Sequence, residues 1–250
     1  MVRHHNNVGL LRLVFASLVI IGHAPEQIDG DNHRELLTVV FHTITLGELS
    51  VDAFFLLSGY LITMSMVQSK SLRTYLERRV LRIYPAYLMA FVLCIFALGP
   101  FVGERPWEHL PQTIGRALLL REPADYPGQL LGLPIPSLNG SMWTIAHEFR
   151  CYLLVAALGT VGLLARRRII LALAVTAAAA TIVGTFPPVS TGLDHLRTHP
   201  RIVALVIGDP WSALRLTTAF MAGSVGYLYR AEIASRLNSW VALGLSLIHI

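Results

Sequence analysis

The chain has 250 residues, of which 54% are hydrophobic and only 14% are charged, and its mean hydropathy is +0.58. Because a soluble domain carries about 25% charged residues, this composition excludes an ordinary soluble enzyme and indicates a polytopic membrane protein. The net charge is +5, but the basic residues lie in short segments between apolar runs, so no soluble basic domain exists that could bind nucleic acid.

Apolar runs long enough to cross a bilayer, about 20 residues each, recur along the chain. The pattern predicts an all-α, polytopic transmembrane helix bundle with six or seven spans. The expected runs cover residues 8–28, 39–67, 83–102, 142–165, 169–186 and 213–229, and a seventh begins near Trp240. An apolar piece at 202–207 is too short to span. Since the sequence ends inside the seventh run, we expect a single membrane domain over residues 1–250 that is incomplete at its C-terminus.

The arginines predict the orientation. If each run crosses once, the basic residues fall on one side of the membrane, and the positive-inside rule assigns that side to the cytoplasm. These basic positions are Arg3, Arg12, the segment 70–82, the arginines at 166–168, Arg230 and Arg236. The N-terminus is therefore expected in the cytoplasm, and the long polar segment 103–141 outside.

Arg12 and His23 share one apolar run and are eleven positions apart. On a helix their side chains point within about 20° of the same direction and are separated by about 16 Å along the axis. Ionisable groups inside a membrane usually mark a pathway or a reaction site. His23 suits proton transfer, because imidazole both accepts and donates protons near neutral pH. The alternatives are a structural histidine and an arginine that reaches the lipid headgroups.

Arg79 and Arg82 lie three positions apart and so face the same side of a helix. Two guanidinium groups in this arrangement suit a multiply charged phosphate. The alternative is a cytoplasmic flank that contacts anionic lipid.

Two carboxylates in apolar surroundings complete the candidate set. Glu148, at the outer start of the fourth run, could polarise a hydroxyl group, pair with His23 or pair with Arg150. Asp52 lies just inside the second run, one turn after Glu48, and could orient His23, bind an acceptor or serve a helix end.

Small and sulfur-containing residues add structural expectations. Ser58-Gly59 is expected to allow close helix packing rather than nucleophilic catalysis, because no Gly-x-Ser-x-Gly elbow is present. Cys94 and Cys151 both lie in apolar runs, so neither a disulfide framework nor a metal site is expected.

Four segments are the most informative about the family of the protein. The first is the pair Arg12 and His23, which are separated by ten residues. The others are SVDAFFLLSGYLI at 50–62, YLERRVLRIYPAY at 75–87, and NGSMWTIAHEFRCYLL at 139–154. Together and in this order they resemble the integral-membrane acyltransferase family 3. Members of that family O-acylate sugars of surface polysaccharides, lipopolysaccharide, peptidoglycan and small glycosides. The resemblance covers about residues 8–230. The family usually has about ten spans, so this chain is short by three or so.

One local departure concerns Ala146-His147, which stands where the family commonly has a proline followed by a different residue. His147 is therefore an additional group.

The resemblance implies roles for the candidate residues. His23 activates the acceptor hydroxyl or carries the acyl transfer, Arg79 and Arg82 hold the phosphates of coenzyme A, and Glu148 belongs to the acceptor site. From its position at the inner end of the first run, Arg12 could meet a thioester or a phosphate, and we expect the thioester there. We therefore expect a membrane O-acyltransferase that moves an acyl group, acetyl in the first instance, from cytoplasmic acyl-CoA to a sugar hydroxyl of a surface glycan or glycoside.

The expected location is a bacterial inner membrane, and the expected partners are the lipid bilayer and a carbohydrate acceptor. Neither a metal nor a nucleic acid is expected, and the sequence gives no oligomeric state. The alternative is a membrane transporter or proton-coupled carrier that uses the buried Arg, His and Asp groups. Such carriers often contain inverted repeats, and this sequence shows no internal repeat.

Overall fold

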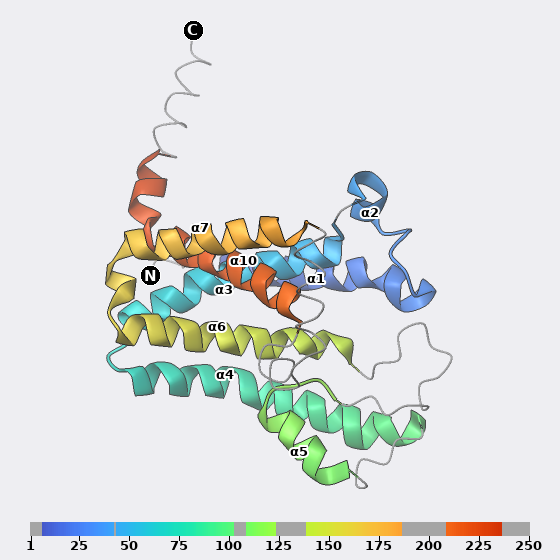
Figure 1. The fold of residues 1–250 in the computed structure, drawn as a ribbon. Coiled ribbons are helices and arrows are strands. Elements are labelled where there is room, and N and C mark those ends of the chain that lie inside the picture. The colour runs from blue at the N-terminus through green and yellow to red at the C-terminus, as the bar shows by residue number, and fades with distance from the viewer. Residues whose placement is uncertain (1–6, 43, 103–108, 124–138, 187–208, 237–250) are drawn as a thin grey trace, which may run out of the picture. The chain divides into compact units, whose positions relative to one another are not determined.

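The computed structural model describes residues 7–42, 44–102, 109–123, 139–186 and 209–236. Every regular element in these ranges is a helix, which confirms the predicted all-α fold (Figure 1). Within the described residues, four helical segments are long and apolar enough to cross a membrane: Val8–Asp29, Leu46–Gln68, Leu72–Phe101 and Arg167–Gly184. The membrane-type bundle is thus confirmed, while six or seven spans remains a prediction. The 202–207 piece and the seventh run lie outside the described residues.

Large apolar side chains cover the outer faces of these helices. Ile20 and Leu81 are each 72% exposed, and Phe101 is 89% exposed. Leaving apolar surface in water costs about 25 cal/mol per Å². These faces therefore indicate contact with lipid rather than with water.

The chain divides into two compact units. The first unit contains residues 1–54 and 73–153, and the second contains residues 55–72 and 154–250. Helix α3 (Leu46–Gln68) and helix α6 (Trp143–Thr160) each contribute residues to both units.

In the first unit, α1 (Asn7–Asp29) lies against the start of α3 at two glycines. A Cβ atom added to Gly22 would lie 2.3 Å from the backbone nitrogen of Gly47, so only a glycine fits there. Further along the same pair of helices, the rings of Phe15 and Phe54 meet edge to face with centroids 5.8 Å apart. The predicted first run is confirmed.

Helix α4 (Leu72–Val92) continues through a π-helical turn, η1 (Leu93–Leu98), and a 3₁₀ turn, η2 (Gly99–Val102). The helix begins eleven residues before the predicted third run. The basic segment 70–82, expected between two apolar runs, therefore belongs for the most part to the first turns of α4.

Tyrosine hydroxyls join α4 to its neighbours in the first unit. Tyr75 donates to the carbonyl of Tyr152 in α6 at 2.9 Å. Tyr84 donates to the carbonyl of Leu118 at the end of α5 (Leu110–Leu118), at 3.0 Å. These bonds supply backbone carbonyls with donors that apolar surroundings cannot provide.

The predicted second run, 39–67, is wrong as a single helix. The structure divides it into α2 (Leu36–Phe41) and α3. His42 ends α2 in the left-handed conformation with φ 58°. Thr45 and Glu48 then form a capping box: Glu48 N–H donates to the Thr45 hydroxyl at 3.0 Å, and Thr45 N–H donates to the Glu48 carboxylate at 3.1 Å.

Glu35 caps two helices with one carboxylate. It is 2% exposed, and it accepts from the backbone N–H of Thr38 in α2 at 2.8 Å and of Leu46 in α3 at 3.0 Å. Burial alone would raise the pKa of Glu35, but these backbone donors hold its pKa below the usual value.

The second unit contains the rest of α3 and α6 together with η5 (Leu163–Ala165), α7 (Arg167–Gly184) and α10 (Pro210–Leu228). Helices α7 and α10 pack along each other (Figure 1). Helices α6, α7 and α10 correspond to the predicted fourth, fifth and sixth runs. Most of their boundaries lie within a few residues of the predicted ones.

Glycines also bring helices together in the second unit. A Cβ atom at Gly59 would lie 1.9 Å from the carbonyl oxygen of Phe220, and one at Gly223 would lie 1.8 Å from that of Leu56. Beside this contact the buried hydroxyl of Thr63 donates to that of Ser224 at 2.9 Å. The close helix packing predicted at Ser58-Gly59 is confirmed.

Gly223→Ala is expected to lower the free energy of unfolding by at least about 1–3 kcal/mol, because the new methyl group would overlap a backbone oxygen that cannot move away. Thermal unfolding in detergent measures this loss. Gly115→Ala in α5 is the matched control: no atom lies within 4 Å of its Cβ position, so a gain of about 0.5–1 kcal/mol is expected. Equal effects of the two changes would contradict the close contact.

Glu35→Gln is expected to cost about 1–2 kcal/mol at neutral pH, the usual value of a helix cap. Because the folded state lowers the pKa of Glu35, its contribution is complete above the unfolded pKa, about 4.3, and is lost as pH falls through the folded pKa. Denaturation measured between pH 7 and pH 3 should therefore lose part of its pH dependence in the variant. Glu77→Gln, at an exposed pair with Arg73, should keep that dependence.

Candidate functional site

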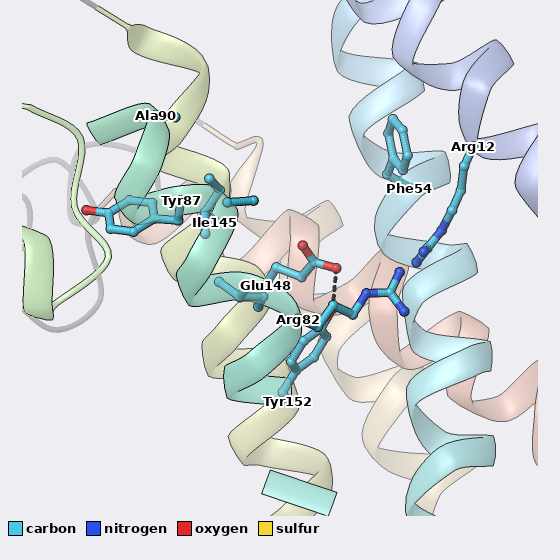
Figure 2. Close-up of a pocket in the computed structure, with 10 residues that line it drawn as sticks. Arg12, Phe54, Arg82, Tyr87, Ala90, Ile145, Glu148 and Tyr152 are labelled. Carbon is cyan, nitrogen blue, oxygen red and sulfur yellow. Dashed lines mark hydrogen bonds between the residues drawn. The ribbon is translucent and has the colours of Figure 1, made fainter. Parts of the chain in front are cut away.

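A pocket of about 380 Å³ lies within the first unit. Helices α1, α3, α4 and α6 each supply at least one of its lining residues. They are Arg12, Phe54, Arg82, Ile83, Ala86, Tyr87, Ala90, Ile145, Glu148 and Tyr152 (Figure 2). Three of the six residues predicted from the sequence, Arg12, Arg82 and Glu148, thus surround one cavity.

The guanidinium groups of Arg12 and Arg82 point toward one another across the pocket (Figure 2). In the part of the chain that the structure describes, neither forms an ion pair with a carboxylate. Arg12 Nε is shielded from solvent and has no hydrogen-bond acceptor there. Two facing cations repel each other, and a shielded donor costs free energy until an acceptor arrives. The arrangement therefore favours binding of an anion.

Glu148 lies on the same pocket wall as Tyr152, one helical turn away on α6. The Tyr152 hydroxyl donates a short hydrogen bond to Glu148 Oε1 (Figure 2). This bond fixes the rotamer of the carboxylate, so the pocket contains an oriented acceptor beside two cationic donors.

Arg79 does not join Arg82 at the pocket. It is buried, and its guanidinium carbon lies 5.8 Å from the ring centroids of both Tyr75 and Tyr152. Two cation–π contacts hold it against the ring whose hydroxyl orients Glu148. The two arginines expected to act together thus occupy different surroundings.

His23 lies further along α1, away from the pocket-lining residues. Its Nδ1 is 3.0 Å from Glu26 Oε2, and its ring packs on Gly47. Asp52 lies in the second turn of α3 and is half-buried. Glu148 and His23 have different hydrogen-bond partners in the structure, Tyr152 and Glu26.

His147, the additional group, is 6% exposed. Its ring meets Trp143 edge to face at 5.4 Å, and its Nδ1 lies 3.3 Å from Arg150 Nη1. These contacts give it packing partners within α6. Within the described residues, no three His, Cys, Asp or Glu side chains gather as a metal site.

Three residues of these sites, Tyr152, Glu26 and Glu35, have no role that was predicted from the sequence. Tyr152 follows Glu148 by four residues and Glu26 follows His23 by three, so helical spacing alone could have identified both pairs. Glu35 is eleven residues from Leu46, and no local pattern predicts that bond.

The described residues form a membrane-type helix bundle with a cationic pocket, and this fold defines the chain as a polytopic membrane protein. Comparison with known proteins agrees with that class. The family model described as an acyltransferase domain matches residues 5–250. The chain therefore belongs to this membrane acyltransferase family, as the four sequence motifs predicted.

Curated relatives carry related names. The chain is 31% identical over 149 residues to an O-acetyl transferase of Shigella phage Sf6, covering 57% of this chain and 42% of that protein. It is 32% identical over 146 residues to acyltransferase MdmB of Streptomyces mycarofaciens, covering 56% and 35%. The matched region thus spans less than half the length of these relatives. No solved structure matches the chain significantly.

Arg79 and Arg82 should respond differently to truncation. Arg79→Ala is expected to lower the free energy of unfolding by about 1–3 kcal/mol, because it removes two cation–π contacts and leaves a buried gap. Arg82→Ala should leave stability unchanged or raise it, because it removes one of two facing cations. Thermal unfolding in detergent compares them. A larger loss for Arg82→Ala would contradict the repulsion at the pocket.

Proposed function

We propose that the protein transfers an acyl group, acetyl in the first instance, from acyl-CoA to a hydroxyl group of a surface glycan or glycoside. Membership of the acyltransferase family supports acyl transfer, and the similarity to the O-acetyl transferase of the phage supports O-acetylation. The observation that carries the proposal is the pair of guanidinium groups, Arg12 and Arg82, that face one pocket without a carboxylate partner among the described residues.

This pair suits the phosphates of coenzyme A. Guanidinium groups bind phosphate oxygens in a bidentate manner, and an anion between Arg12 and Arg82 relieves their repulsion. A cavity of about 380 Å³ takes the phosphate-bearing part of the donor rather than all of it. Arg79 supports the pocket from behind the Tyr152 ring instead of contacting the donor.

His23 is the proposed base. It lies about 16 Å from Arg12 along α1, a span comparable with the extended pantetheine arm that separates the phosphates of coenzyme A from its thioester. With the phosphates at Arg12 and Arg82, the thioester reaches His23, which takes the proton of the attacking hydroxyl. This arrangement moves Arg12 from the thioester to the phosphate end of the donor.

The two carboxylates serve the substrates in this proposal. Glu148, oriented by Tyr152, accepts hydrogen bonds from amide or hydroxyl groups that enter the pocket. Asp52 lies on α3 five residues beyond Gly47, which packs on His23, and binds hydroxyls of the acceptor.

The proposed location is a bacterial inner membrane with the N-terminus in the cytoplasm. The support is the positive-inside distribution of arginines at the ends of the apolar runs. Acyl-CoA then enters from the cytoplasm, and a glycan acceptor is modified on the outer side.

His23→Ala is expected to lower acyl transfer by about 10²- to 10⁴-fold, the contribution of a positioned general base. Surface glycans of a host lacking the gene, complemented with wild type or variant, are compared by mass spectrometry for the added acyl mass. His33→Ala, at an exposed histidine beyond the end of α1, is the matched control and should keep activity.

Arg82→Ala distinguishes binding of the acyl-CoA donor from the catalytic step at His23. It should weaken acyl-CoA binding by about 1.5–3 kcal/mol, the scale of a charge-assisted hydrogen bond, while His23→Ala leaves that binding intact. Normal acylation by the His23→Ala protein would show that His23 is not the base. Solute uptake by reconstituted vesicles without any acyl transfer would instead support the transporter alternative.

A further inference from the structure

His23 has two ring nitrogens with different surroundings. Nδ1 lies 3.0 Å from Glu26 Oε2, one helical turn further along α1. Nε2 faces the start of α3, where a Cβ atom added to Gly47 would lie 3.0 Å from it. The missing side chain at Gly47 is what leaves room for the ring.

The Glu26 contact determines which nitrogen carries the proton. An ionised carboxylate only accepts hydrogen bonds, so the nitrogen beside it, Nδ1, must be the donor. The lone pair of neutral His23 is then on Nε2. The side chains of His23 and Glu26 are 41% and 32% exposed, so the described residues do not bury the pair completely.

Other carboxylates lie on the elements packed around His23, and most already bind backbone amides. Glu35 accepts from Leu46 N–H, and Glu48 accepts from Thr45 N–H, both at the start of α3. Asp52 lies one turn beyond Glu48 and makes contacts of its own. The hydrogen bond that the structure gives to the His23 ring is accepted by Glu26 Oε2.

We infer that Glu26 is the positioning residue of His23, a role that rests on the proposed function of His23 as the base. The acceptor hydroxyl transfers its proton to Nε2 while its oxygen forms the new C–O bond to the thioester carbonyl. The C–S bond then breaks, and the thiolate of coenzyme A takes the proton back from Nε2. Between these steps the carboxylate of Glu26 stabilises the imidazolium through Nδ1–H.

Two substitutions separate the two effects of Glu26 on His23, the orientation of the ring and the negative charge beside it. Glu26→Ala removes both, and is expected to lower kcat at least about tenfold with KM for acyl-CoA unchanged. Glu26→Gln keeps an oxygen that accepts from Nδ1–H but loses the charge, so its kcat should lie between those of Glu26→Ala and wild type. Glu77→Gln, at an exposed glutamate of α4, is the control and should behave as wild type.

Nitrogen-15 NMR of histidine-labelled full-length protein reads the bond independently of activity. The chain has 10 histidines, and His23 is assigned by the signals missing in His23→Ala. Wild type and Glu26→Gln should show His23 protonated on Nδ1, whereas Glu26→Ala should show a mixture of tautomers. Unchanged tautomers in Glu26→Ala, or a wild-type kcat, would overturn the role of Glu26. Full activity of His23→Ala with a changed tautomer in Glu26→Ala would overturn the proposed function while leaving the bond in place.

Discussion

Contact between helices at glycine residues is the constraint on which the rest of the structure depends. Helices in a bilayer gain little by burying apolar side chains against each other, because lipid is equally apolar, so close approach and interhelical hydrogen bonds must hold them. In the first unit Gly22 meets Gly47, and in the second Gly59 and Gly223 meet backbone carbonyls. The hydroxyls of Thr63 and Ser224 add a hydrogen bond at the second contact.

The glycine contact of the first unit also arranges chemistry. The absence of a side chain at Gly47 both lets α1 approach α3 and leaves the space in which the His23 ring lies. In the same unit, an aromatic ring supports the cationic pocket. Tyr152 orients Glu148 through a hydrogen bond, and Arg79 contacts the Tyr152 ring. Packing and candidate site therefore use the same residues, so stability and activity should be measured together for each variant.

The sequence predicted the helices well and their internal arrangement less well. Apolar runs determine helix positions because every backbone group in lipid must be bonded within its own segment. The end of α2 at Phe41 and the start of α3 at Leu46 were missed, although the sequence pattern of the capping box, Thr45 and Glu48, was present. One pocket is lined by Arg12, Arg82 and Glu148 because of how three helices pack. No local sequence pattern predicts that packing. For the same reason Arg79 and Arg82, neighbours in sequence, lie in different surroundings.

The shared cap at Glu35 has a consequence for the order of assembly. Helix α2 has only six residues, and helices this short are not stable alone in water because nucleation costs more than a few bonds return. Its cap also binds Leu46, the first residue of α3. During synthesis, α2 is therefore expected to stay unformed until residue 46 has left the ribosome and α3 has begun to insert. The six-residue helix therefore forms only after residues beyond its own C-terminal end have been translated.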